Sequence, residues 1–434
     1  MKRPIGKDAI DKLTGVTPLM FDEAFRAQMD LPKHVIINDI TLREGRQIEG
    51  TILTQEECLK VADVLINDLN VPMIQMVGGY NARDTDYLRQ VARFVEQSGK
   101  PVRMEAMTSA HQNFPRFNQA QLLDTISNIA DAGFGVVICL ASSDNMLKGC
   151  AIHRGQQGMS VEDLRKQEIE IGVAAIEHAR KLGMKEVNVN FQDFLRADLD
   201  YLKHFSKAVA DAGAGMITLD DFGGGLAIPR LYTELFRQVK NVVPNTILGV
   251  HAHNSAGLAV ADALASVEGG CEMITVGVNA YGDGAGHVSM AETIYCLEYL
   301  YGIDTGINIE RLRPAAVFMA DMMRQQLPIM SPLVGENAFV LIADKHHSFP
   351  EYPFLFEPMS PELVGNRYRP GFGERAGPFG LRITAKTLGF SIPDEKIQPM
   401  LKAMEEHMRW HKRKISDVEF RQLADKVGIE GAVV

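Results

Sequence analysis

The sequence predicts an α/β fold, a (β/α)8 barrel followed by a mostly helical C-terminal subdomain. Short apolar runs rich in β-branched residues recur along about the first 300 residues, and the stretches between them suit helices and are too long for hairpins. Eight such units over about 265 residues match the usual size of about 250 residues for this barrel. A doubly wound sheet is the alternative, but the glycine-rich turn expected after its first strand is absent.

The elements can be placed in order along the chain. Thr54 and Glu57 form a capping box that begins the first helix after strand one. Gly223–Gly225 follows the sixth strand but lacks dinucleotide-binding spacing, so we interpret it as a tight turn. The predicted strands cover residues 35–39, 72–77, 102–107, 135–140, 186–191, 215–219, 246–250 and 273–278.

The strand–helix rhythm ends near residue 302, which predicts three parts. Residues 1–34 are an N-terminal extension without an assigned structure, and residues 35–302 form the barrel. Residues 303–434 form a helical post-barrel region, with a helix expected over 310–327.

Charge and cysteine content limit the classes of function. The chain has 45 Lys and Arg against 55 Asp and Glu, a net charge of −10, which argues against nucleic acid or an anionic membrane as the main partner. Its five cysteines contain no C-x-x-C pair, and we see no signal peptide, so we expect a cytoplasmic protein without disulfide bonds.

Polar residues that could bind a metal or take part in catalysis follow the ends of the predicted strands. A barrel of this kind places its chemistry at the C-terminal ends of its strands. Strand seven ends in His251 and His253, whose i, i+2 spacing directs both imidazoles to one face. With Glu44 after strand one, they could hold a divalent ion with open positions, Mn²⁺, Mg²⁺ or Co²⁺ before a structural zinc, although Zn²⁺ is possible. The alternative is a polar cluster whose hydrogen bonds are internally satisfied.

Three segments of the barrel then resemble the 2-isopropylmalate synthase and homocitrate synthase family of the DRE-TIM metallolyases. Asp39–Gln47 resembles the opening D-x-T-L-R-[DE]-G-x-Q motif, Val250–Ala259 the H-x-H-N strand end, and Asn279–His287 the glycine loop after strand eight. Beyond the barrel, Pro332–Phe339 and Pro361–Gly365 resemble a subdomain of the acyl-CoA-dependent members. The resemblance covers roughly residues 35–400 and implies a TIM barrel.

The resemblance implies a reaction and a role for each matching residue. It implies the condensation of acetyl-CoA or another acyl-CoA with a 2-oxo acid, by a homodimer. Arg43 would stabilise the developing alkoxide, and His346 would contribute from the post-barrel subdomain. Glu44, His251 and His253 would be the metal ligands, Gln192 and Asp193 would lie in the catalytic region, and Arg46, Gln47, Gln75, Asp221 and Asn279 would contact substrate.

Several positions depart from the family pattern. Gln75 and Gln192 replace glutamates, and His287 replaces an asparagine in the glycine loop. Further along, Phe356 replaces a tyrosine and Leu341 a histidine. Because a glutamine cannot act as a general base, that role falls to His346, Asp193 or Asp221.

The metal ligands and Arg43 match the family pattern, whereas the residues expected for proton transfer depart from it. Three hypotheses follow from this difference. The first is a synthase for an unusual 2-oxo acid, similar to Re-citrate synthase or phosphinomethylmalate synthase, with Arg46 and Arg83 holding an extra anionic group. The second is a carbon–carbon lyase on the same centre. The third is a catalytically silent protein that binds an oxo acid.

Overall fold

The computed structural model describes residues 19–29, 31–110, 119–348, 356 and 359–432. The chain packs as two compact units, residues 18–327 and a second unit that includes residues 328–434. Most of the predicted N-terminal extension, residues 1–18, lies outside the described residues.

The first unit contains a closed barrel of parallel strands in the order β1 to β8, which confirms the predicted fold class. β1 closes the barrel by pairing with both β2 and β8, so that Asp39 stands beside Ile74 on one side and Val276 on the other. The strands are β1 Ile36–Asp39, β2 Met73–Val77, β3 Arg103–Ser109, β4 Gly135–Ala141, β5 Val187–Gln192, β6 Met216–Asp220, β7 Ile247–His251 and β8 Met273–Val276.

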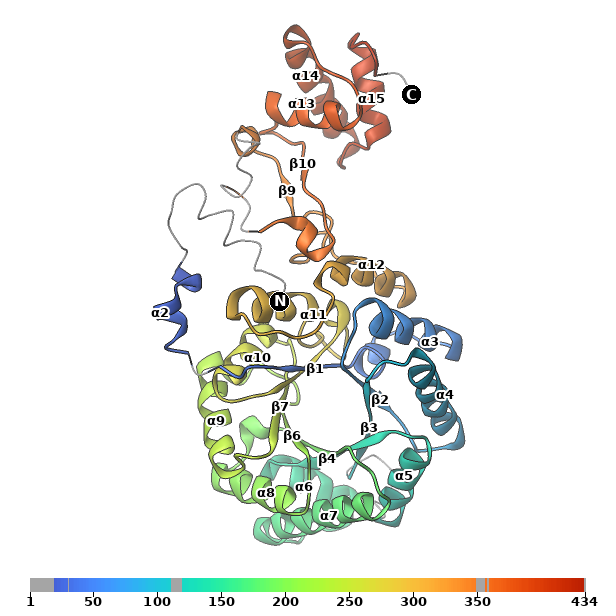
Figure 1. Cartoon of the computed structure of the whole chain (residues 1–434), viewed down its shortest axis with the longest axis vertical. Coiled ribbons are helices and arrows are strands. Elements are labelled where there is room, and N and C mark those ends of the chain that lie inside the picture. The colour runs from blue at the N-terminus through green and yellow to red at the C-terminus, as the bar shows by residue number, and fades with distance from the viewer. Residues whose placement is uncertain (1–18, 30, 111–118, 349–355, 357–358, 433–434) are drawn as a thin grey trace. The chain divides into compact units, whose positions relative to one another are not determined.

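Helices surround the strands, as Figure 1 shows. The predicted capping box is present, because the Thr54 side chain accepts from the backbone of Glu57 while the Glu57 side chain accepts from that of Thr54. The helices of this unit are α2 Glu23–Arg26, α3 Gln55–Asp63, α4 Ala82–Ser98, α5 Gln119–Asp131, α6 Asp144–His153, α7 Val161–Lys181, α8 Leu199–Asp211, α9 Pro229–Val242, α10 Ala259–Glu268, α11 Met290–Tyr295 and α12 Leu312–Met322.

The buried core of the barrel strands combines an apolar cluster with a polar network. Met73, Met216 and Met273, each at or near the first residue of its strand, form a buried cluster. The network is centred on Glu105 of β3, which is 1% exposed and accepts hydrogen bonds from three side-chain amides. Burial raises the pKa of Glu105 against the opposing effect of these donors. The amides belong to Asn38, Gln75 and Asn188.

The second unit is mainly helical in its described part. Its α-helices are α13 Pro378–Thr387, α14 Asp394–His411 and α15 Asp417–Lys426, and its two short parallel strands are β9 Val340–Leu341 and β10 Arg369–Pro370. The helices share an apolar core that includes Leu381, Met400 and Phe420. Among the helices that the structure describes in the whole chain, none has the length and apolar character needed to cross a membrane.

Candidate metal centre

Two imidazoles stand together at the end of β7. His251 is the last residue of the strand and is 1% exposed, and His253 follows two residues later. Their ring centroids lie 5.1 Å apart. The i, i+2 spacing thus brings both rings to one place at the C-terminal end of the barrel, as the sequence predicts.

Hydrogen bonding fixes the tautomer of His251. Nδ1 of His251 lies 2.9 Å from Oγ1 of Thr275, and that hydroxyl donates to the carbonyl oxygen of Val250 at 3.1 Å. Because the hydroxyl proton of Thr275 is donated to Val250, Nδ1 of His251 must be protonated and donate to Oγ1 of Thr275. Nε2 of His251 then carries a lone pair. Burial also lowers the pKa of His251 well below its usual range, which favours the neutral, ligating form.

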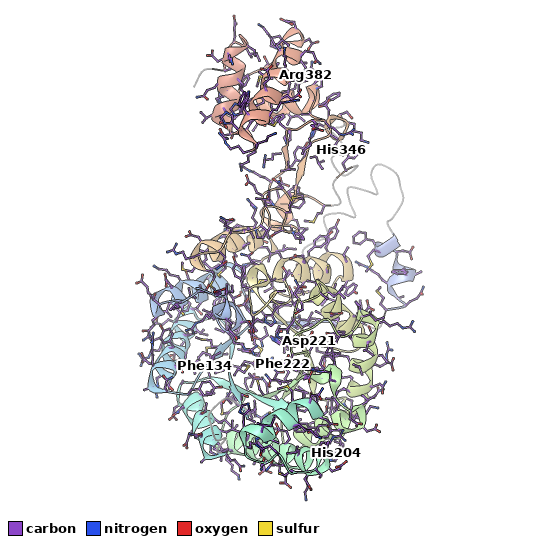
Figure 2. The ribbon with its side chains drawn as sticks, turned by 180° about the vertical axis from the view of Figure 1, so that it is seen from behind. Phe134, His204, Asp221, Phe222, His346 and Arg382 are labelled. Atoms are coloured by element: carbon purple, nitrogen blue, oxygen red, sulfur yellow. The ribbon has the colours of Figure 1, made fainter. Side chains whose placement is uncertain are left out.

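A carboxylate orients His253 in the same way. Nδ1 of His253 lies 2.6 Å from Oδ1 of Asp221, which also accepts from the hydroxyl of Tyr232 at 2.8 Å through its other oxygen. Burial lowers the pKa of His253, but Asp221 and Asp220 outweigh it and leave that pKa raised. A carboxylate behind a histidine is the usual partner of a metal ligand, since it fixes the ring and increases its basicity. Figure 2 shows Asp221 inside the ring of helices.

A third imidazole, His287, joins the pair from the loop after β8. Its ring centroid lies 4.6 Å from that of His251 and 4.3 Å from that of His253. One nitrogen from each of the three rings lies within 4.8 Å of the other two. In the sequence, His287 stands out only as a departure from the family pattern, and a third histidine in the glycine loop is the signal that points to a further candidate ligand.

Two backbone contacts hold the His287 loop in place. The N–H of Asn254 donates to the carbonyl oxygen of Gly286 at 2.8 Å, and the N–H of His287 donates to that of Ala280 at 3.0 Å. Gly286 has a φ of +84°, and a Cβ there would lie 2.1 Å from the oxygen of Ala280. The position therefore requires glycine.

Glu44 supplies a carboxylate to the same group of side chains. It is 4% exposed, and its Oε2 lies 3.3 Å from Nε2 of His287. Burial raises the pKa of Glu44, but Arg43 and His287 outweigh burial and leave that pKa at about 2. Arg43 is 5% exposed, and its Nη1 lies 2.8 Å from Oε1 of Glu44 and 3.5 Å from Nε2 of His251. Gln47 donates to Oε2 of Glu44.

These side chains fit a divalent metal ion. His287 is 1% exposed; its Nε2 faces Oε2 of Glu44 at 3.3 Å, but its Nδ1 has no hydrogen-bond partner among the described residues. A buried polar nitrogen without such a partner is costly unless something else binds it. Three imidazole nitrogens beside one carboxylate form a donor set typical of such an ion. A second possible group, of Asp220, Asp221 and His253, shares His253 with the first.

The residues predicted to contact substrate have different surroundings. Gln75 is buried and donates to Oε1 of Glu105 at 2.6 Å, within the polar network of the barrel. Asn279 donates to the carbonyl oxygen of Ala316 in α12 at 2.8 Å. Arg46 lies over the ring of Tyr87, with 5.6 Å between its guanidinium carbon and the ring centroid.

The residues predicted for proton transfer belong to both units of the chain. Asp193 is fully buried and accepts hydrogen bonds from Ser143 and, at 2.7 Å, from Arg196. Gln192 ends β5 and is half-buried. His346 belongs to the second unit, where its ring centroid lies 4.6 Å from that of Phe356.

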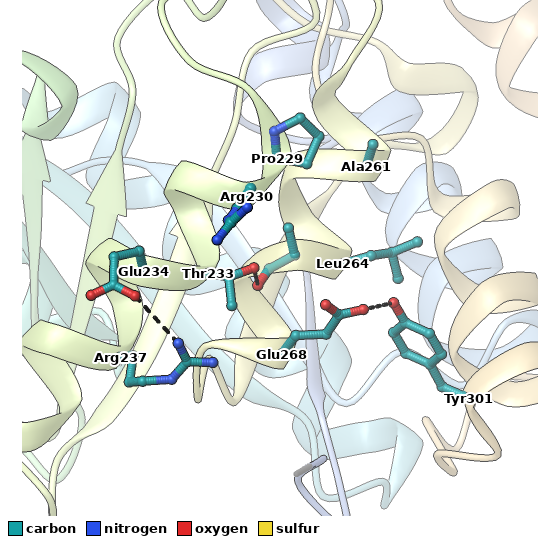
Figure 3. A pocket seen from close by; sticks show the side chains of 10 residues that line it. Pro229, Arg230, Thr233, Glu234, Arg237, Ala261, Leu264, Glu268 and Tyr301 are labelled. Atoms are coloured by element: carbon teal, nitrogen blue, oxygen red, sulfur yellow. Dashed lines mark hydrogen bonds and ion pairs between the residues drawn. The ribbon is translucent and has the colours of Figure 1, made fainter. Parts of the chain in front are cut away.

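A separate cavity of about 780 Å³ lies between α9 and α10, on the outer helices rather than at the strand ends. Figure 3 shows that polar side chains lining this cavity pair with one another, Glu234 with Arg237 and Glu268 with Tyr301. We assign no function to it.

The fold and these side chains define a class: a TIM-barrel protein with a group of histidines and a glutamate at its strand ends that could hold a metal ion. A family model described as HMGL-like matches residues 34–319, and the chain belongs to this family. It is therefore a member of the DRE-TIM superfamily, as its motifs predict.

Curated relatives are similar to most of the chain. A protein from Ignicoccus hospitalis named "Probable 2-isopropylmalate synthase" is 29% identical over 92% of this chain and 93% of its own length. An Archaeoglobus fulgidus protein named "Putative (R)-citramalate synthase CimA" is 30% identical over 91% of this chain and 75% of its own. The crystal structure of the HMG-CoA lyase from Brucella melitensis covers 68% of this chain and 100% of its own with a TM-score of 0.54; at 17% identity, it supports the fold alone.

Proposed function

We propose that this protein condenses an acyl-CoA, with acetyl-CoA as the expected donor, with a 2-oxo acid at a divalent metal centre, and that water then hydrolyses the thioester of the product to release CoA. The observation that carries the proposal is the convergence of His251, His253 and Glu44 beside the guanidinium of Arg43. The names of the relatives, an isopropylmalate synthase and a citramalate synthase, support the class of reaction.

The binding half of the mechanism rests on Arg43 and the ligands. His251, His253, His287 and Glu44 would hold the ion, whose chemistry at this place is to polarise the ketone of the 2-oxo acid. Arg43 is buried and is kept in position by Glu44. Its guanidinium would donate to the ketone oxygen as negative charge develops there, a contribution that is often worth a factor of about 10²–10³ in rate.

The proton-transfer half needs a base that removes a proton from the methyl group of the acyl-CoA. Asp193 already accepts from Ser143 and Arg196, and Asp221 already accepts from His253 and Tyr232. Protonation of either carboxylate would weaken these hydrogen bonds, because it removes the negative charge that the donors face. We therefore propose His346, whose Nδ1 has no hydrogen-bond partner among the described residues.

The substrate we propose carries a second anionic group. Arg46 and Arg83 both lie over the ring of Tyr87, with 5.6 Å and 5.9 Å between each guanidinium carbon and the ring centroid. Two cations gathered on one tyrosine near the first and second strands favour a carboxylate, a phosphonate or a phosphinate. Replacing Arg46 with alanine should raise the KM for such a 2-oxo acid and leave the KM for the acyl-CoA unchanged.

Isotope labelling tests the proposed reaction directly. Metal-loaded protein would be incubated with acetyl-CoA labelled in its methyl group and with candidate 2-oxo acids, and the products would be identified by mass spectrometry. The proposal predicts a labelled 2-hydroxy dicarboxylate that also keeps the second anionic group of the 2-oxo acid, together with free CoA. Cleavage of a hydroxyacyl-CoA without condensation would instead identify a lyase.

A further inference from the structure

The metal centre contains one more imidazole than the motifs of the sequence predict. His287 stands where the family has an asparagine, and its ring packs against both His251 and His253. With Glu44, the donor set becomes three nitrogens and one carboxylate oxygen. The asparagine pattern would provide two nitrogens and two oxygens.

Nitrogen donors change which ion a site prefers. Imidazole suits Zn²⁺, Fe²⁺, Co²⁺ and Cu²⁺, whereas carboxylate, carbonyl and water oxygens suit Mg²⁺ and Mn²⁺. Mg²⁺ also loses its waters reluctantly and is seldom enclosed by protein side chains alone. Exchanging an amide oxygen for an imidazole therefore disfavours Mg²⁺ most.

The protein positions each of the three rings for this purpose. Thr275 binds Nδ1 of His251, and Asp221 binds Nδ1 of His253, so that Nε2 remains available on both rings. The His287 ring is packed closely, because a Cβ on Gly282 would meet its Cδ2 at 1.9 Å. Only glycine leaves room for the ring in this position.

We propose that His287 is a ligand and that it makes the centre selective for a borderline transition ion, Zn²⁺ or Co²⁺, over Mg²⁺. The inference rests on the metal centre of the proposed function, but it does not depend on which reaction the protein catalyses.

Competition between ions tests the selectivity. Chelator-stripped full-length protein would be dialysed against a mixture of Zn²⁺, Co²⁺, Mn²⁺ and Mg²⁺ at equal concentrations, and the bound metal would be measured by elemental analysis. We expect zinc or cobalt in the wild type. In His287→Asn, the ratio of zinc affinity to magnesium affinity should fall by roughly tenfold or more, since one imidazole is lost.

A matched variant and a second measurement make the test decisive. His204 is an exposed histidine of α8, at the outer edge of the first unit in Figure 2, and His204→Asn should keep the selectivity of the wild type. Thermal unfolding shows whether His287→Asn is folded. If it is not, crystals of zinc-loaded wild type should show an anomalous peak about 2.0–2.1 Å from a nitrogen of His287.

The proposal fails if the wild type takes up magnesium as readily as zinc, if folded His287→Asn keeps the selectivity of the wild type, or if the anomalous peak lies away from His287. Selective zinc or cobalt binding without any condensation activity would leave this inference in place and contradict the proposed function. Condensation activity at a site that prefers magnesium would support the proposed function and contradict this inference.

Discussion

Oδ1 of Asp221 lies 2.6 Å from Nδ1 of His253, so that a buried carboxylate orients the more exposed imidazole of the candidate metal centre. The same carboxylate accepts from the backbone N–H of His253 and from the hydroxyl of Tyr232. Asp221 is thus held in place by His253 itself and by Tyr232, which does not belong to the three-histidine cluster.

Replacing Asp221 with asparagine should weaken metal binding. The amide keeps the size of the side chain but removes the charge that increases the basicity of His253, a change that typically costs about 10–100-fold in metal affinity. Titration calorimetry with Zn²⁺ measures this loss. Tyr232→Phe removes only the hydrogen bond that the tyrosine donates to Asp221, so it should reduce the metal affinity less. Equal losses of affinity in the two variants would contradict the role assigned to the charge of Asp221.

Replacing Arg43 with alanine should separate binding from catalysis. The guanidinium lies beside the ligands without belonging to the donor set. We expect kcat to fall by about 10²–10³-fold, as on removal of an oxyanion donor, while one ion remains bound. Steady-state kinetics and elemental analysis on the same preparation check both parts. A variant with unchanged kcat would remove Arg43 from the mechanism.

Gly286→Ala should disturb the metal centre through the backbone. A methyl group at this position meets the carbonyl oxygen of Ala280 at 2.1 Å, and the loop that carries His287 must shift. Metal affinity should therefore fall. Gly284 also has a positive φ, of +59°, but a Cβ there meets nothing within 4 Å, so Gly284→Ala is the matched control and should bind metal more tightly than Gly286→Ala.

Asp39, at the end of β1, should make the stability of the protein depend on pH. Burial raises its pKa to about 7 from 3.8, although hydrogen bonds from Thr41 oppose the shift. Because the folded state binds the proton more tightly than the unfolded state, the stabilisation is present below about pH 4 and is lost as the pH rises through about 7.

The free energy of unfolding, measured with urea at pH 5 and pH 8, tests this prediction. Between these values the wild type should lose roughly 1–3 kcal/mol more than Asp39→Asn, which cannot ionise. Asp131→Asn, an exposed change at the end of α5, should behave as the wild type does. Equal pH dependence in Asp39→Asn and the wild type would contradict the assignment.

The barrel could be predicted from the sequence because its signals are local. Apolar β-branched runs mark strands such as Gly135–Ala141, and the predicted ends agree with the structure to within one or two residues. The pairing of His251 with His253 was predictable for the same reason, because it depends only on the period of a strand.

The remaining features of the site depend on closure of the barrel. His287 reaches the other histidines because Asn254 binds the backbone of Gly286, a contact between separate βα loops. Gln75 lies beside Glu105 only through the register of β2 on β3. The hydrogen bonds that occupy Asp193 and Asp221 are likewise tertiary contacts, so that sequence reasoning left both as candidate bases.

The release of CoA tests the proposed condensation most directly. Metal-loaded protein would be mixed with acetyl-CoA and, one at a time, with glyoxylate, pyruvate, 2-oxoisovalerate, oxaloacetate, 2-oxoglutarate and phosphonate or phosphinate analogues, and free thiol would be followed with a thiol reagent. We expect thiol release that requires one of these 2-oxo acids and that disappears in metal-stripped protein. If no 2-oxo acid of the panel causes thiol release while metal is demonstrably bound, the proposed condensation is contradicted.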